Sequence, residues 1–159
     1  MRVIALLLAA ILLTGCALRL PAAPPPLPTP TPTPDATAAF EAAYADMLAA
    51  YNALSAEMDG KDNTTAVFAD ADYRARLAEL AADWRTASNA VRYAEQPAGE
   101  RWAKAWPRIT DAMAEFAALA TLVEHAARDN DPTLMWGGGP RLAAAVALLD
   151  EAIGLLGRE

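Results

Sequence analysis

The sequence predicts an all-α domain, an up-down-up-down antiparallel four-helix bundle over residues 36–159. Three observations lead to this fold class. Apolar residues recur every three or four positions in four successive segments, which is typical of helices that bury one face. Glycine, proline, asparagine and aspartate separate these segments, and no stretch alternates with the period of two expected of a strand. The short connections favour antiparallel neighbours with left-handed packing.

The chain begins with a short apolar run, residues 3–13, which follows the single positive charge of Arg2 and leads into Leu13-Thr14-Gly15-Cys16. The run is too short to cross a bilayer as a helix and is typical of a signal sequence. The four residues resemble the lipobox of bacterial lipoproteins. This resemblance covers about the first 16 residues. It implies that residues 1–15 are a removed signal peptide and that Cys16 is the lipid attachment site, bearing diacylglyceryl and palmitate-like chains.

Residues 16–35 are predicted to form a proline-rich linker, with proline and threonine alternating from Pro28 to Pro34. Proline fixes φ and removes a backbone donor, so polyproline II is the default conformation here. At about 3.1 Å per residue the segment extends on the order of 50 Å. Whether it is a stiff spacer or an unstructured tail, it tethers the domain to the lipid.

The first two helices are predicted on either side of a break at Asp59-Gly60, where the glycine suits a left-handed helix end. The apolar stripe of the first helix is Phe40, Tyr44, Met47, Tyr51, Leu54 and Met58. The stripe of the second is Tyr73, Leu77, Leu80, Trp84, Ala87 and Val91.

The last two helices are predicted after breaks at residues 96–99 and 129–140. The stripe of the third helix is Trp102, Trp106, Ile109, Met113, Phe116, Ala120, Val123 and Ala127, and that of the fourth is Leu142, Val146, Leu149, Ile153 and Leu156. Pro107 is expected to kink the third helix or to delay its start. Pro140 is expected at the first position of the fourth helix.

Charge and cysteine content exclude several classes of function. The net charge is −7, whereas nucleic-acid binding normally requires a basic excess, so we expect no nucleic-acid partner. Cys16 is the one cysteine, and lipidation would consume its thiol. The domain therefore has no cysteine for a disulfide or for thiolate chemistry.

No set of residues predicts catalysis or a cofactor. His125, the one histidine, stands beside Glu124 and one turn from Asp129. Its place between Val123 and Ala127 puts His125 on the flank or outside of the helix, and two carboxylates and one imidazole on a surface are expected to be solvated and not to hold a metal. The methionines of the apolar stripes are expected to fill the core and not to ligate haem. We therefore expect no metal, no cofactor and no enzymatic activity.

Two sets of residues are candidate contact sites. Trp102, Trp106, Met135 and Trp136 are candidates for binding a ligand or partner. The last two belong to the segment 134–139, which combines three large apolar residues with three glycines. This loop is interpreted either as a mobile lid or, preferably, as a plug for the open end of the bundle.

Arg92, Arg101 and Arg108 form the second candidate site, a basic patch facing the envelope. The segment 84–108 has a net charge of +3 in an otherwise acidic protein, and the bundle topology places it at the same pole as the tether. The patch could face anionic lipid or wall polymer. Pairing with acidic residues of neighbouring helices is an equally good interpretation.

Two functions remain for the whole chain. The first is a non-enzymatic lipoprotein on the extracytoplasmic side of the cell membrane or outer membrane. It would be anchored to the bilayer through acylated Cys16 and would contact an envelope protein or wall polymer. The second is a binding module that holds a small apolar or aromatic ligand between its helices, near the tryptophans. An apolar pocket of about 300 Å³ or more would favour the second function.

Overall fold

The computed structural model describes residues 35–61 and 65–157 of the 159-residue chain. The signal peptide, Cys16 and the linker up to residue 34, all predicted from sequence, lie outside the described residues. The part of the chain that is described is entirely helical between its turns and contains no strand, which confirms the predicted all-α class.

The first helix, α1 (Ala36–Met58), begins at Asp35, whose carboxylate accepts a hydrogen bond from the backbone N–H of Thr37 at 3.0 Å. It ends at Asp59, and Gly60 follows with a φ of +68°, the left-handed conformation predicted there. A short helix that the sequence did not predict, α2 (Thr65–Phe68), then places the Phe68 ring fully inside the core.

Helix α3 (Ala71–Arg92) is capped by Asp70, whose carboxylate accepts hydrogen bonds from two backbone N–H groups of the first turn. Helix α4 (Glu100–Asp129) follows Gly99, and Asn130 caps its C-terminal end with a left-handed φ of 53°. The delayed start expected from Pro107 is wrong, because α4 begins seven residues before it and continues through it. One α4 carbonyl, that of residue 103, consequently has no i+4 donor.

The connection to the last helix is a 3₁₀ helix, η2 (Pro132–Gly137), where the sequence suggested a loop. Helix α5 (Gly138–Leu156) follows without a break. Pro140 therefore occupies the third position of α5 instead of the first. It is still tolerated, because first-turn N–H groups have no partner within a helix.

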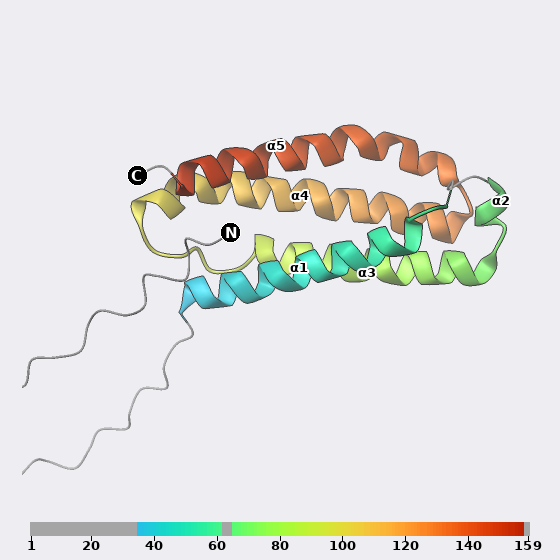
Figure 1. Cartoon of the computed structure of the whole chain (residues 1–159), viewed down its shortest axis with the longest axis horizontal. Helices are drawn as coiled ribbons and strands as arrows, with labels where there is room; N and C mark the ends of the chain where they lie inside the picture. Colours follow the sequence, from blue (N-terminus) through green and yellow to red (C-terminus); the bar gives the residue numbers. More distant parts are fainter. Residues whose placement is uncertain (1–34, 62–64, 158–159) are drawn as a thin grey trace, which may run out of the picture. The chain divides into compact units, whose positions relative to one another are not determined.

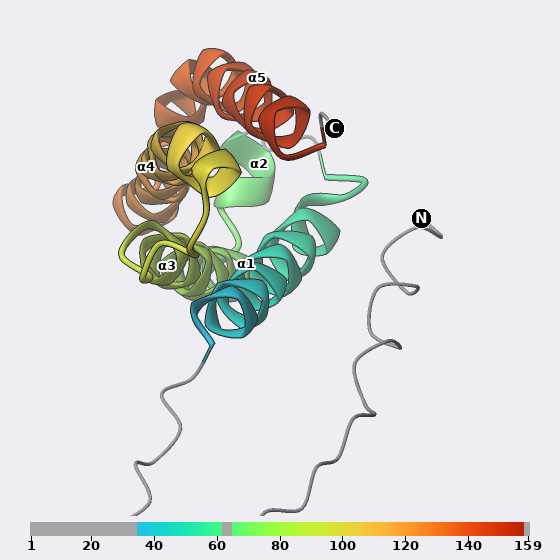
Figure 2. The ribbon, with the colours of Figure 1, turned by 90° about the vertical axis from the view of Figure 1, so that its left-hand side faces the viewer.

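Three close helix–helix contacts organise the fold. Helix α1 packs on α3, α3 on α4, and α4 on α5, with successive long helices running in opposite directions (Figure 1). No contact of comparable extent joins α1 to α5. Viewed along the helices, the four long helices form an arc whose two ends are α1 and α5 (Figure 2).

The core lies inside this arc and consists largely of the residues that the apolar stripes predicted. Met47, Leu77, Trp84 and Met113 are almost completely buried. Small residues complete the packing, including Ala105, Ala112, Ala120 and Ala126 of α4, and they let neighbouring helices approach closely.

Candidate functional site

An apolar groove runs between α1 and α5, the two helices at the ends of the arc. Both helices direct apolar stripes toward it, and the described residues place no other helix over it. Each stripe recurs at the helical spacing that buries one face, so each would normally be covered by a neighbour. Phe40, Met47 and Leu54 of the α1 stripe are buried, and the other side chains of the two stripes form most of the walls of a groove, which we name the α1/α5 groove.

Three consecutive cavities make up the α1/α5 groove. We name them by one residue each: the Phe40 cavity, of about 210 Å³, the Leu48 cavity, of about 130 Å³, and the Met135 cavity, of about 220 Å³. Tyr44 and Leu149 line both the first and the second cavity. Tyr51 and Leu142 line both the second and the third. The cavities therefore follow one another along the full length of the two helices.

The floor of the groove is a cluster of aromatic rings tilted against one another. Trp84 of α3 is 1% exposed and lies with its ring centroid 5.3 Å from that of Tyr51 and 5.6 Å from that of Phe116. The Nε1 atom of Trp84 is buried and has no hydrogen-bond partner among the described residues. Since α1, α3 and α4 each contribute one ring, the floor is held by three helices.

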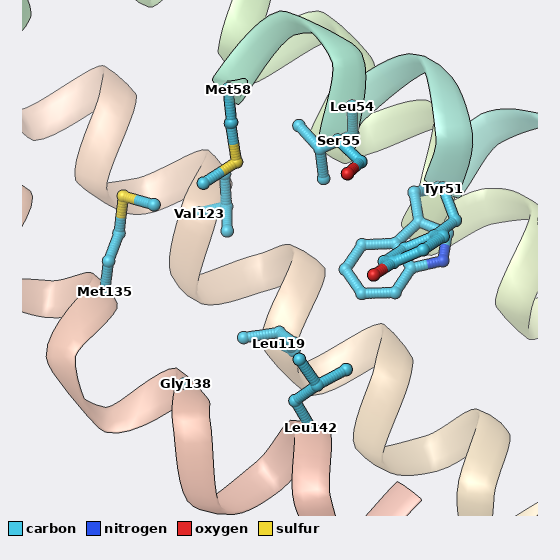
Figure 3. A pocket seen from close by; sticks show the side chains of 10 residues that line it. Tyr51, Leu54, Ser55, Met58, Leu119, Val123, Met135, Gly138 and Leu142 are labelled. Atoms are coloured by element: carbon cyan, nitrogen blue, oxygen red, sulfur yellow. The ribbon is translucent and has the colours of Figure 1, made fainter. Parts of the chain in front are cut away.

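The Met135 cavity forms one end of the groove (Figure 3). Met58 at the end of α1 and Met135 in η2 extend toward each other across it, while Leu119 and Leu142 form the opposite wall. Ser55 and Tyr51 supply hydroxyl groups to an otherwise apolar lining. Unbranched methionine side chains adapt readily to an occupant, so this end can change shape more easily than the aromatic floor.

The mouth of the groove exposes large apolar side chains. Leu48 is 41% exposed, Val146 47% and Ile153 62%. Burial raises the pKa of Tyr44, whose side chain lines the wall between the first two cavities. A contiguous apolar strip of this kind is typical of a contact surface.

The four aromatic and methionine residues singled out from the sequence do not form one site. Trp102 and Trp106 pack edge-on against Phe40, with ring centroids 5.2 and 5.6 Å from it. Met135 lines the groove, whereas Trp136 is 80% exposed and points away from the core. Within the segment 134–139, Met135 packs against the core, whereas Leu134 and Trp136 are exposed.

The three arginines of the predicted basic patch have different surroundings. Arg108 forms an ion pair with Glu151 of α5 at 2.8 Å. The Arg92 guanidinium lies over the ring of Tyr93, at 5.2 Å from its centroid. Arg101 is exposed on the first turn of α4.

The expectation for Glu124 is wrong, because its side chain is only 3% exposed and not on the outer face. It pairs with Arg85 of α3 at 3.1 Å and with Arg128, one turn along α4, at 2.6 Å. His125 is exposed, as expected. Within residues 35–61 and 65–157, no three His, Cys, Asp or Glu side chains come together to hold a metal ion.

A second depression lies on the other side of α1, between it and α3. It is wide, about 490 Å³, but it is shallow and lined by alanines, Thr86 and the carboxylates of Asp46 and Asp83. Small side chains leave this surface nearly flat, so it offers a ligand much less enclosure than the α1/α5 groove.

None of the helices in the described part of the chain is both long and apolar enough to cross a membrane. The comparisons with known proteins give no family to which the chain could be assigned. No protein-family model matches it, and neither a curated protein nor a solved structure shows significant similarity to it.

Proposed function

We propose that this protein is a lipid-anchored, extracytoplasmic lipoprotein whose helical domain is a non-enzymatic binding module. In this proposal α1, α3, α4 and α5 are the four helices of an up-down-up-down, left-handed bundle that is open between α1 and α5. The observation that carries the proposal is the α1/α5 groove, which presents apolar side chains along two whole helices.

The chemistry of the lining supports binding instead of catalysis. Apart from the buried indole nitrogen of Trp84, the polar side-chain atoms of the lining are the hydroxyls of Tyr44, Tyr51 and Ser55. Acid–base catalysis needs a titratable group near neutral pH and a second polar group that orients it. The groove instead supplies apolar area, for which the hydrophobic effect contributes about 25 cal/mol per Å² buried.

A neutral apolar fluorophore, N-phenyl-1-naphthylamine, tests this function. We expect it to bind the mature chain (residues 16–159 with Cys16→Ser) and to quench the emission of Trp84 in the groove floor. Val146→Trp would fill the Leu48 cavity and weaken binding at least about tenfold, equivalent to about 1.4 kcal/mol. Ala147→Trp, one residue along and outside the groove lining, is the matched control and should bind normally. Equal binding by both variants would contradict the proposal.

The anchor has its own test. Residue 16 is expected to be acylated and to be the first residue of the mature protein, as the lipobox resemblance implies. Mass spectrometry of the N-terminal peptide should find the added acyl mass, and Cys16→Ser should release the protein from membranes. An N-terminal peptide that begins at Met1 with an unmodified Cys16 would refute the anchor.

Envelope contact through Arg92, Arg101 and Arg108 stays part of the proposal, with anionic lipid or wall polymer as the partner. Each basic side chain near an anionic surface contributes about 1 kcal/mol. Replacing all three by glutamine should weaken binding of the lipid-free chain to anionic vesicles, and unchanged binding would exclude this contact.

A small apolar molecule is the second candidate occupant, favoured by the Met135 cavity. Its volume of about 220 Å³ is below the 300 Å³ expected of a drug-sized site, and it suits only a small molecule. Solvent extraction of the purified protein followed by mass spectrometry should then recover one apolar compound in stoichiometric amount.

A further inference from the structure

We propose that the α1/α5 groove is the docking site for a basic amphipathic helix of a partner protein. The inference rests on the proposed function, because it names the class of partner that the groove takes. Three observations carry it: the spacing of the cavities, the charges beside the groove, and the exposure of its mouth.

The cavities are spaced as the side chains of a bound helix would be. Tyr44 and Tyr51 of α1, each of which lines two neighbouring cavities, are seven residues apart, and so are Leu142 and Leu149 on α5. Seven residues of helix rise about 10 Å. A helix lying along the groove presents an apolar side chain at this same interval, so successive heptads place one side chain in each cavity.

The lining of the groove argues against a fatty acid as its occupant. It has no cation for a fatty-acid carboxylate. Helix α1 contains no lysine or arginine, and Arg141, the one basic residue of α5, pairs with Glu115 at 2.8 Å.

Free carboxylates stand beside the groove on both walls. Glu41 lies two turns before Leu48 on the same side of α1, and Asp150 lies one turn after Val146 on α5. Both are exposed, and neither has an ion-pair partner among the described residues. Lysine or arginine beside the apolar stripe of a bound helix would pair with them, as at the flanking positions of coiled coils.

The mouth of the groove leaves apolar area for the partner to cover. Leu48, Val146 and Ile153 are each at least 41% exposed, and they lie on both walls. A docked helix would bury them between its own apolar side chains and complete the set of neighbours that α1 and α5 lack.

Two designed 21-residue helical peptides test the inference on the mature chain. Both carry leucine at the heptad core positions; one has lysine at all flanking positions and the other has glutamate. We expect the lysine peptide to bind at least about tenfold more tightly at low salt. Replacing one leucine per heptad by alanine should abolish its binding, because the cavities would be left empty.

Charge reversal locates the site. Glu41→Lys combined with Asp150→Lys should reverse the preference, so that the glutamate peptide binds more tightly. Asp46→Lys with Asp111→Lys changes the net charge equally at exposed positions outside the groove lining, and should leave the preference for lysine unchanged. Equal binding of the two peptides, or loss of the preference in the control pair, would overturn the inference.

Binding of the neutral fluorophore distinguishes failure of the helical-partner inference from failure of the proposed binding function. If it binds in the groove but neither peptide does, the helical partner is refuted and the binding function stands, with a small apolar molecule as occupant. If neither the fluorophore nor a peptide binds, the proposed function itself fails.

Discussion

Gly138 is the most informative single position for testing the groove. It lines the Met135 cavity and lies beside Leu119, which lines the same cavity. A Cβ added there would lie 2.6 Å from Cδ1 of Leu119, whereas carbon atoms in contact are usually about 3.5–4.0 Å apart. The leucine methyl must therefore withdraw by about 1 Å. The Met135 cavity, which both residues line, is the space beside it.

The energetic effect of Gly138→Ala follows from two opposing terms. Gly138 has helical φ and ψ of −73° and −33°, so alanine gains about 0.4–1 kcal/mol by restricting the unfolded chain. Displacing Leu119 should lower the free energy of unfolding by about 1 kcal/mol or somewhat more. This is the lower end of the range for overpacked side chains, because Leu119 can move into open space. We expect an unfolding free energy close to that of the unsubstituted protein.

Gly139→Ala is the matched control, because an added Cβ there meets nothing within 4 Å. It should stabilise the protein by about 0.4–1 kcal/mol, so the two variants should differ by about 1 kcal/mol in urea unfolding followed by tryptophan fluorescence. The fluorophore should bind several-fold more weakly to Gly138→Ala and normally to Gly139→Ala. Equal stability and equal binding of the two variants would refute the described contact between α5 and Leu119.

Three further predictions concern the rest of the domain. Ser88 is fully buried and its hydroxyl has no partner among the described residues, so Ser88→Ala should leave stability unchanged or raise it by up to about 1 kcal/mol in urea unfolding; a clear loss would reveal a partner. Arg85→Met should lower the free energy of unfolding by about 2–3 kcal/mol, because it leaves the buried carboxylate of Glu124 with one cation. Arg76→Met removes an exposed ion pair and should lower it by about 0–1 kcal/mol. Equal losses in the two variants would contradict the burial of Glu124. Because burial raises the pKa of Tyr44, this tyrosine ionises at a lower pH in the unfolded chain than in the folded one, and the free energy of unfolding should fall above about pH 10. The fall should be less steep in Tyr44→Phe. Identical dependence on pH in the two proteins would refute the shift.

The apolar periodicity predicted the helices and most of the core, because both depend on local spacing. Leu54, Leu77 and Ile109 are buried where the stripes placed them. Phe68 was missed because α2 is one turn long, and a single turn has no periodicity to detect.

The burial of Glu124 shows that tertiary contacts can override the expectation that a charged side chain is exposed. Its position four residues after Ala120 and three before Ala127 indicated the buried face, and that signal was available in the sequence. Its cation Arg85, however, comes from another helix, and no local pattern predicts that pairing.

The α1/α5 groove could not be predicted from the sequence, for a related reason. An apolar stripe indicates that a helix needs a neighbour, but the stripe does not specify which helix supplies it. Trp102, Trp106 and Trp136, the predicted contacts, do not line the groove, which is made mainly by side chains of α1 and α5. Trp102 and Trp106 are instead packed against Phe40.

Chemical-shift mapping tests the central claim most directly, because it reports where an occupant touches the domain. Backbone amide shifts of the ¹⁵N-labelled mature chain would be followed during titration with the lysine-flanked peptide. We predict that the largest shifts fall on α1 and α5, around Leu48 and Val146, and that the exposed faces of α3 and α4 change little. Shifts centred on α3 and α4, or no shifts at saturating peptide, would contradict the claim that the open side of the domain is its binding surface.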